Sequence, residues 1–392
     1  MNEILNLNIN EMAQTEFDCS CGRHHNFEIH DLAVGPGAIQ KLPEFAAPFK
    51  DGQILMVYDN NTFKAAGKQA RDLLTDAGFN IKELYFDRGS DILIPDESVV
   101  GRILQEIEAD TKLIIAVGGG SLNDSCKYVT CRTKMPYMIV GTAPSMDGYV
   151  SDGAPLMSAG RKISYPAHLA YAVICDTDIM KLAPQELIQA GFGDVVGKIT
   201  ALTDWDLSVK VTGEYRCETT VELVRRALNK CFEKSDQLPQ RDGDAINALI
   251  EALILTGVAM ALVRVSRPAS GAEHMLSHYW EMDYIARGLN PIHHGTQVGT
   301  ATPVIARFFE KLSDILPEGT GQLCPPHEEI EKLLRDAGAP VTPKDIGISK
   351  ELFHASLMEG YKVRPRYSVL KFAMDNGRLE QIADEITTEI YG

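Results

Sequence analysis

The sequence predicts an α/β domain with a parallel β-sheet, followed by an all-α domain. The first observation behind this prediction is the length of 392 residues, which exceeds what one hydrophobic core usually fills. The second is the alternation of short apolar runs with helical stretches up to residue 180, the pattern of a parallel sheet covered by helices. The third is that helical periodicity continues alone after that point. We therefore expect two domains, residues 1–180 and 181–392.

Apolar runs bounded by Gly, Asp or Pro predict strands in the first domain, at 53–58, 81–86, 112–117 and 137–143. Helical spacing fills the intervals at 62–79 and 96–110. The second domain carries helical segments at 194–210, 218–234, 244–265, 327–338 and 378–391. Loops rich in Gly, Pro and Asp separate them. The cleft between two such domains is the expected ligand site.

Composition describes an ordinary soluble globular protein, with 45% hydrophobic and 23% charged residues. The formal net charge of −16 argues against nucleic acid or an anionic membrane as the main partner. No uninterrupted apolar run reaches about 18 residues, so no membrane span is expected. The N-terminus lacks the order of a secretory signal, and eight mostly scattered cysteines suit reduced thiols. We expect a cytoplasmic protein.

One stretch, "CSCGRHH" at residues 19–25, clusters cysteine and histidine and has two interpretations. Cys19, Cys21, His24 and His25 lie close enough in sequence to bind a zinc ion. However, a Cys-x-Cys step is tighter than the usual spacing of structural zinc ligands, and a simple loop leading into a strand needs no metal. The sequence leaves both open.

A glycine-rich turn, Gly118-Gly119-Gly120-Ser121, joins an apolar strand to a helix. Glycines let the backbone approach a phosphate closely, and the start of the helix offers N–H groups to an anion. This favours a nucleotide phosphate over a tight turn without a ligand. Asp59 lies just past an earlier strand, where a carboxylate can accept from ribose hydroxyls and repel a 2′-phosphate. A turn-forming Asp-Asn-Asn explains Asp59 equally well.

Polar residues that could bind a metal fall in three segments of the helical half. A helix is expected to open with Asp194 in the segment "AGFGDVVGK". His274 and His278 lie on one helical face in "SGAEHMLSHYW". His293 and His294 lie in "NPIHHGTQVGT". One carboxylate and two imidazoles suit Zn²⁺, Fe²⁺ or Ni²⁺ with a position left for substrate. The alternative is an Asp N-cap and histidines that are satisfied at helix ends.

These segments, taken in order, resemble the metal-dependent polyol dehydrogenases. That superfamily includes the iron-type alcohol dehydrogenases, glycerol dehydrogenase and dehydroquinate synthase. "AVGGGSLNDSCKYV", "TAPSMDGYVSDGAP", "FGDVVGK", "SGAEHMLSHYWEM" and "HHGTQVG" follow one another as in that superfamily. The chain is most similar to its sn-glycerol-1-phosphate dehydrogenase family, in the bacterial AraM-like branch, over nearly the full length. The resemblance implies a Rossmann-like domain followed by a helical one, the dehydroquinate synthase-like fold.

The resemblance also implies site residues. The metal ligands would be Asp194, His274 and His294, and His278 would be a polar or proton-relay group. Asp147 matches a carboxylate that meets substrate hydroxyls, so Asp147 and His278 are the catalytic candidates. His293 has no implied role, but as the neighbour of His294 it is an alternative ligand. The cofactor contacts would be Asp59, Gly118, Gly119, Gly120, Ser121, Asp124, Thr142, Ser145 and Lys162.

Lys127 fits the same glycine-loop pattern but is expected to be helix structure alone. The substrate phosphate needs a cation, for which Lys198 is the candidate and Arg364 or Arg366 the alternatives. His278 shares a helical face with His274 without ligating, so "EHMLSH" would be half a metal site.

The activity implied is NAD(P)H-linked interconversion of dihydroxyacetone phosphate and sn-glycerol 1-phosphate, a step of phospholipid metabolism. NAD(H) is expected over NADP(H), with one divalent ion, nickel or zinc, and iron as a further option. Rival interpretations are a glycerol dehydrogenase acting on the free polyol, a dehydroquinate synthase-like lyase that releases phosphate, and a nucleotide-binding protein without activity. The expected assembly is a homodimer or larger oligomer.

Overall fold

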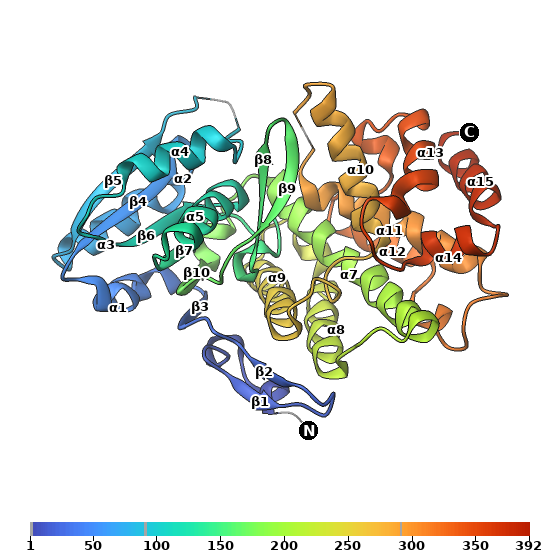
Figure 1. Cartoon of the computed structure of the whole chain (residues 1–392), viewed down its shortest axis with the longest axis horizontal. Helices are drawn as coiled ribbons and strands as arrows, with labels where there is room; N and C mark the ends of the chain where they lie inside the picture. Colours follow the sequence, from blue (N-terminus) through green and yellow to red (C-terminus); the bar gives the residue numbers. More distant parts are fainter. Residues whose placement is uncertain (1–2, 90–91, 291) are drawn as a thin grey trace. The chain divides into compact units, whose positions relative to one another are not determined.

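The computed structural model describes residues 3–89, 92–290 and 292–392 and divides into two compact units (Figure 1). Unit 1 comprises residues 1–184 and 241–262, and unit 2 comprises residues 185–240 and 263–392.

Unit 1 is built on a six-stranded sheet in the order β3-β10-β7-β6-β4-β5, in which every pairing is parallel. The strands are β3 (Asp31–Gly35), β4 (Gln53–Asp59), β5 (Asn80–Phe86), β6 (Thr111–Gly118), β7 (Tyr137–Gly141) and β10 (Ala172–Asp176). Central strands such as β6 and β7 are buried along almost their whole length, which is why their sequences read as continuous apolar runs. The predicted parallel sheet is confirmed.

Helices cover both faces of this sheet. On one face, α1 (Leu42–Ala46) and α3 (Lys68–Asp76) pack on alternate residues of β4, including Ile54 and Met56. On the other face lie α4 (Glu97–Glu106) and α5 (Gly120–Thr133), which contact each other while α5 contacts β6 and β7. The short helices α2 (Asn60–Thr62) and α6 (Thr177–Met180) follow β4 and β10.

The direction of chain progression reverses between β4 and β6. From β4 the chain runs outward to the edge strand β5, then returns to β6 on the other side of β4 and continues to β7 and β10. The carboxyl ends of β4 and β6 are therefore neighbours at a topological switch point, where open α/β sheets bind ligands. Asp59 ends β4 and Gly118 ends β6.

Two antiparallel hairpins complete the strands of unit 1. One pairs β1 (Glu16–Asp18) with β2 (His24–Asn26), and the other pairs β8 (Gly153–Ser158) with β9 (Arg161–Pro166). Neither hairpin was predicted from the sequence, nor were β3 and β10. These strands are only three to six residues long, so periodicity alone gives a weak signal for them.

The helix α9 (Gly243–Val263) departs from the predicted division at residue 180, because the structure groups residues 241–262 with unit 1. Its Asn247 amide oxygen accepts a hydrogen bond from Thr177 at 2.8 Å, and a side chain at Gly257 would collide with Val150. The helix is long and apolar enough to cross a membrane, but 83% of its most apolar window is buried. A helix in the core of a protein is also long, apolar and buried, so the apolar composition of α9 is explained by its burial in the protein.

Unit 2 is helical and has its own core. Its helices are α7 (Gln185–Thr212), α8 (Glu218–Phe232), α10 (Ala272–Ala286), α11 (His294–Lys311), α12 (His327–Asp336), α13 (Lys350–Glu359), α14 (Val369–Asp375) and α15 (Leu379–Tyr391). Trp280, Phe308 and Phe353 are fully buried in a cluster that joins α10, α11 and α13 to the C-terminal helices. The prediction that the second half of the chain is helical is confirmed. Helix α9 is part of that half in sequence but belongs to unit 1.

Candidate metal centre and nucleotide loop

Three helices of unit 2 bring one carboxylate and two imidazoles together. Asp194 lies in α7, His274 in α10, and His294 is the first residue of α11. One ligand atom from each lies within 4.8 Å of the others, and the two imidazole rings are 5.1 Å apart between centroids. Asp194 is fully buried and His274 is 5% exposed. Residues that lie 20 to 100 positions apart in sequence thus form one compact donor set.

Asp194 does not open a helix, and the N-cap alternative for it is wrong. Helix α7 begins at Gln185, so Asp194 lies in its interior, where every backbone N–H already has a helical partner. An interior Asp has low helix propensity and is fully buried here, which calls for a charged or hydrogen-bonding partner.

Glycines allow the helices that carry the donors to approach closely. A Cβ atom at Gly295 would lie 1.9 Å from the Ala190 carbonyl oxygen, and one at Gly193 would lie 2.3 Å from the Gly295 carbonyl oxygen. A Cβ at Gly197 would meet Val298 at 2.5 Å. Since real side chains do not tolerate such distances, α7 and α11 can cross at this depth only without them. The glycines of "GFGDVVG" and "HGTQVG" therefore set the distance between Asp194 and His294.

A buried carboxylate holds the His274 ring in one orientation. Nδ1 of His274 donates to Oε1 of Glu273 at 2.8 Å, and that oxygen also accepts from the Gly271 N–H at 2.6 Å. The other Glu273 oxygen accepts from the Thr200 hydroxyl at 2.6 Å. With Nδ1 protonated, Nε2 of His274 keeps its lone pair and lies 3.7 Å from Oδ1 of Asp194.

Burial lowers the pKa of His274 well below its ordinary value, and the Lys198 charge lowers it further. Burial also raises the pKa of the Glu273 carboxyl, against the hydrogen bonds from Thr200 and Gly271. A neutral imidazole is the form that binds a metal ion. The donor set of one carboxylate and two imidazoles, with the Glu273 carboxylate hydrogen-bonded to His274, fits a divalent transition metal.

Lys198 is fully buried one helical turn after Asp194, and its Nζ lies 2.5 Å from Oδ1 of Asp194. The predicted phosphate cation thus lies beside a predicted metal ligand. In this position Lys198 supplies the positive charge that the buried carboxylate needs.

His278 and Arg364 form a second layer around the donors. The His278 ring lies 5.6 Å from that of His294, and Nη2 of Arg364 is 2.9 Å from Nε2 of His278. Arg366, the other arginine candidate, donates hydrogen bonds to the Ser266 hydroxyl and to the Ser270 carbonyl oxygen. His293 is the N-cap residue of α11 and lies outside the donor set.

In unit 1, the glycine loop has the geometry of an anion site. Gly119 is the N-cap of α5 in an extended conformation and makes no side-chain cap, and Gly120 is the first helical residue. A Cβ at Gly118 would lie 2.6 Å from Leu122, whereas a Cβ at Gly119 would meet nothing within 4 Å. Gly118 is thus required by packing, and Gly119 leaves open space over the first turn of the helix.

Asp59 has both of the features predicted for it. It ends β4 beside β6 at the switch point, and its Oδ1 accepts from the N–H groups of Asn61 and Thr62 at 2.9 and 2.8 Å. The Thr62 hydroxyl in turn accepts from the Asp59 N–H at 2.9 Å, completing a capping box. The turn-forming interpretation is therefore confirmed, and the ribose contact of Asp59 stays a prediction.

Asp124 and Lys127 lie inside unit 1, one turn apart on α5. Burial raises the pKa of Asp124, and the nearby Lys127 and Lys162 charges oppose this. Nζ of Lys127 donates to the carbonyl oxygens of Gly148 and Gly153 and to the Ser151 hydroxyl, at 2.9 to 3.1 Å. Lys127 is thus a structural clamp on the chain between β7 and β8.

The remaining predicted residues of unit 1 lie beyond the carboxyl end of β7 or on the second hairpin. The Thr142 N–H donates to the Gly118 carbonyl oxygen at 3.2 Å, which ties this segment to the glycine loop. Ser145 follows in the same segment, and Asp147 precedes the short 3-10 helix Gly148–Val150. Lys162 lies in β9 opposite Met157.

Sequence reasoning missed Glu273, Thr200 and the close-packing glycines, all of which shape the metal centre. An acid directly before His274 was visible in "AEHM", but adjacent helical residues point in different directions, so the Glu273–His274 contact was not predictable from spacing. The repeated glycines in α7 and α11 were the available signal for close helix packing.

Comparison with known proteins identifies relatives over nearly the whole chain. A family model described as "Iron-containing alcohol dehydrogenase" matches residues 33–184. The glycerol-1-phosphate dehydrogenase [NAD(P)+] of Bacillus licheniformis is 31% identical over 382 residues, covering 95% of each chain. The enzyme of that name from Methanosarcina barkeri is 31% identical and covers 90% of this chain and 93% of its own.

Solved structures support the same fold at lower identity. A probable glycerol dehydrogenase from Sinorhizobium meliloti aligns with a TM-score of 0.68 at 18% identity, covering 91% of this chain and 96% of its own. The NADH-dependent butanol dehydrogenase A of Thermotoga maritima aligns with a TM-score of 0.67 at 17% identity, covering 95% and 99%. At these identities the likeness concerns the fold alone.

Proposed function

Because the chain belongs to the glycerol-1-phosphate dehydrogenase family, we propose that it interconverts dihydroxyacetone phosphate and sn-glycerol 1-phosphate. The family makes the protein an oxidoreductase that acts on a CH–OH group with NAD(P) and a metal. The observation that carries the proposal is the meeting of Asp194, His274 and His294 within 4.8 Å of one another.

Asp194, His274 and His294 would hold one divalent ion, for which the donor set suits nickel or zinc, with iron as an alternative. When bound, the ion supplies a Lewis acid that polarises a substrate carbonyl oxygen. Glu273 fixes the His274 ring through its 2.8 Å contact, so the lone pair of Nε2 stays directed at the donor set. This orientation is set before substrate binds, which lowers the cost of assembling the site.

Gly118 to Ser121 and Asp59 would bind the dinucleotide at the switch point of the sheet. The open space over Gly119 suits a pyrophosphate, and Asp59 at the end of β4 suits the adenosine ribose. A carboxylate there disfavours a 2′-phosphate, so we propose a preference for NADH over NADPH. The bound dihydronicotinamide supplies the hydride. Asp124, Thr142, Ser145 and Lys162 are the further cofactor contacts proposed.

His278 and Asp147 are the proposed groups for moving a proton to or from the substrate oxygen. An imidazole suits a proton relay near neutral pH, and the Arg364 contact holds the His278 ring in place.

Lys198 and Arg364 are the proposed partners of the substrate phosphate, since both lie beside the donor set in a protein of net charge −16. If a dication satisfies Asp194, the Lys198 ammonium no longer neutralises that carboxylate alone and can face an anion.

We further propose a cytoplasmic location and a homodimeric or larger assembly. The eight thiols agree with a reducing compartment. Light scattering on the purified chain measures the assembly, and a monomer would contradict it.

The test is an assay of the metal-stripped chain reloaded separately with Ni²⁺, Zn²⁺ or Fe²⁺. We expect NADH oxidation with dihydroxyacetone phosphate, a chiral product resolved as sn-glycerol 1-phosphate, and much weaker reaction with dihydroxyacetone or glycerol. Equal rates with phosphorylated and free substrates would indicate a polyol dehydrogenase instead. Phosphate release without net NADH consumption would indicate a lyase. An Asp194→Ala variant should lose turnover and the metal that Asp194, His274 and His294 hold.

A further inference from the structure

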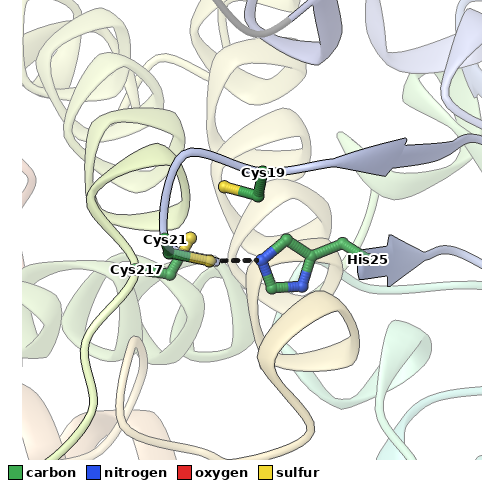
Figure 2. Close-up of side chains that lie close together, drawn as sticks. All are labelled: Cys19, Cys21, His25 and Cys217. Carbon is green, nitrogen blue, oxygen red and sulfur yellow. Dashed lines mark hydrogen bonds between the residues drawn. The ribbon is translucent and has the colours of Figure 1, made fainter. Parts of the chain in front are cut away.

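A second cluster of metal-binding side chains lies in unit 1, on the hairpin formed by β1 and β2. Figure 2 shows the side chains of Cys21 and His25 directed at each other, with the Cys19 sulfur beside them. Sγ of Cys21 is 3.2 Å from Nε2 of His25. The candidate ligand atoms of Cys19, Cys21 and His25 lie within 4.8 Å of one another. Asp194, His274 and His294 belong to a different group, so this is a separate site.

The turn between the two strands places both sulfurs on one side. The Cys19 N–H donates to the Arg23 carbonyl oxygen, and the Gly22 N–H donates to the Cys19 carbonyl oxygen at 2.9 Å. Gly22 has a φ of +83°, in the left-handed region that favours glycine. The chain therefore curls back within four residues, which brings a Cys-x-Cys step close to a histidine on the returning strand.

The pleat of the returning strand selects one of its two histidines. In β2, His25 is 2% exposed, whereas His24 points to the other face, is exposed and pairs with Asp18 at 2.9 Å. Of the four residues that the sequence offered for zinc, His24 is thus excluded from the cluster, because neighbouring strand residues face opposite sides.

The His25 ring is held in the tautomer that a metal needs. Its Nδ1 lies 2.7 Å from the carbonyl oxygen of Leu262, which is a pure acceptor, so Nδ1 carries the proton. Nε2 then presents a lone pair toward the Cys21 sulfur. A histidine that donates its second nitrogen to a backbone carbonyl oxygen is the usual arrangement of a metal ligand. Leu262 lies in the last turn of α9, whose carbonyl oxygens lack helical partners.

We propose that Cys19, Cys21 and His25 bind a zinc ion that cross-links the β1–β2 hairpin, in which His25 also contacts the end of α9. Two thiolates and one imidazole are soft and intermediate donors that suit zinc, and Mg²⁺ or Ca²⁺ would instead need oxygen ligands. Two strands of three residues each are too short to be stable as an isolated hairpin, so a metal link contributes to their folding.

Zinc in structural sites takes four ligands, and the hairpin supplies three of them. The fourth position is open to a water molecule or to another thiolate. The three ligands of unit 1 define the proposed site.

The test is cobalt substitution of the full-length chain under a non-chelating reductant. Thiolate ligation gives a sulfur-to-cobalt charge-transfer band, which the Asp194–His274–His294 donor set cannot produce because it contains no sulfur. We expect the wild type to show the band and to bind a second equivalent of metal, and the Cys21→Ser and His25→Ala variants to lose both. His24→Asn and Cys131→Ser are the matched controls and should keep the band.

A wild-type chain without a thiolate band would overturn the proposal, as would a Cys21→Ser variant that keeps the full band. If the variants do not fold, X-ray absorption of the zinc-loaded His274→Ala chain decides between sulfur in the coordination shell, as expected, and oxygen and nitrogen alone, which refutes it. Dehydrogenase activity enters none of these readouts.

Discussion

At the scale of single residues, the least expected feature is the buried pair of Lys198 and Asp194. Both side chains are fully buried, and their atoms Nζ and Oδ1 are 2.5 Å apart. Removing one partner of such a pair costs more than the pair contributes, because the other charge is left without compensation. A divalent ion bound to Asp194 can neutralise that carboxylate in place of Lys198. Metal binding therefore changes which partner the Lys198 ammonium contacts.

We therefore expect Lys198→Ala to separate substrate binding from metal binding. The KM for dihydroxyacetone phosphate should rise by roughly 10- to 150-fold, the loss of about 1.5–3 kcal/mol of a charged hydrogen bond. Metal content, measured by elemental analysis, should remain. Lys210→Ala on the same helix is the control, since Lys210 contacts Glu318 and Thr320 instead. An unchanged KM would show that Lys198 does not bind the substrate phosphate and would leave Arg364 as its proposed partner.

Asp59 permits a test in which cofactor choice is separated from folding. Serine is also a good N-cap residue, so Asp59→Ser keeps the cap on Asn61 and Thr62 while removing the charge. We expect the ratio of kcat/KM for NADH over that for NADPH to fall at least tenfold. Asn61→Ser is the neighbouring control. If the ratio stays the same in Asp59→Ser, Asp59 is a helix cap and nothing more.

At the scale of elements, the packing of α7 on α11 builds the metal centre. Gly295→Ala should force these helices apart, because its Cβ would lie 1.9 Å from the Ala190 carbonyl oxygen. We expect a loss of stability of a few kcal/mol, typical of overpacking, together with weaker metal binding. Gly101→Ala in α4 is the control, since its Cβ meets nothing within 4 Å, and it should stabilise the chain by about 0.5–1 kcal/mol. Chemical unfolding and metal titration measure both effects.

Asp204 joins α7 to the first residues of two other helices. It accepts from the N–H groups of Ala272 and Val369 at 2.6 Å each, and burial raises its pKa to about 7. In the unfolded chain the carboxyl has the ordinary pKa of about 3.9, so between about pH 4 and pH 7 the folded chain binds a proton that the unfolded chain has lost. The contribution of Asp204 to the free energy of unfolding therefore decreases as the pH rises through this range.

In the metal-free chain, Asp204→Asn should flatten this part of the stability profile. The thermal midpoint of the variant should therefore fall less than that of the wild type between pH 5 and pH 7, measured by scanning calorimetry. Asp314→Asn, at an exposed position, should leave the profile unchanged. Parallel profiles for wild type and Asp204→Asn would show that Asp204 keeps an ordinary pKa.

At the scale of the whole molecule, the metal links three helices of unit 2 and should stabilise that unit by mass action. Nickel or zinc at a hundredfold excess over Kd should add about 2.7 kcal/mol, seen as a higher thermal midpoint that a chelator reverses. The comparison is made in a Cys21→Ser background, which removes the zinc site proposed in unit 1. There His294→Ala should abolish the increase, and His293→Ala, which changes the neighbouring residue outside the donor set, should retain it. A metal-dependent increase that survives in the Cys21→Ser, His294→Ala double variant would count against the donor set.

Much of this architecture could be read from the sequence, because its signals are local. A buried parallel strand such as β6 is a continuous apolar run, and a helix such as α8 repeats its apolar residues every turn, so both were predicted close to their observed bounds. The glycine loop was recognisable because strand, turn and helix are adjacent in the chain. The candidate metal ligands were identified from the resemblance, which rests on the order of the motifs. The spacing of these residues alone is also explained by an N-cap at Asp194 and by histidines that cap helix ends.

Tertiary structure decided what depends on segments that are distant in sequence. The membership of α9 in unit 1, the closeness of Asp194 to His294, and the Glu273 contact that orients His274 follow from packing. The same holds for the selection of His25 over His24, which depends on a pleat and on a carbonyl oxygen of Leu262, 237 residues further along the chain. Sequence alone determined which chemical groups the chain carries and the elements that carry them. Which of these groups come into contact was decided by tertiary packing. Surfaces far apart in the chain pack together so that water is excluded between them and their atoms do not overlap.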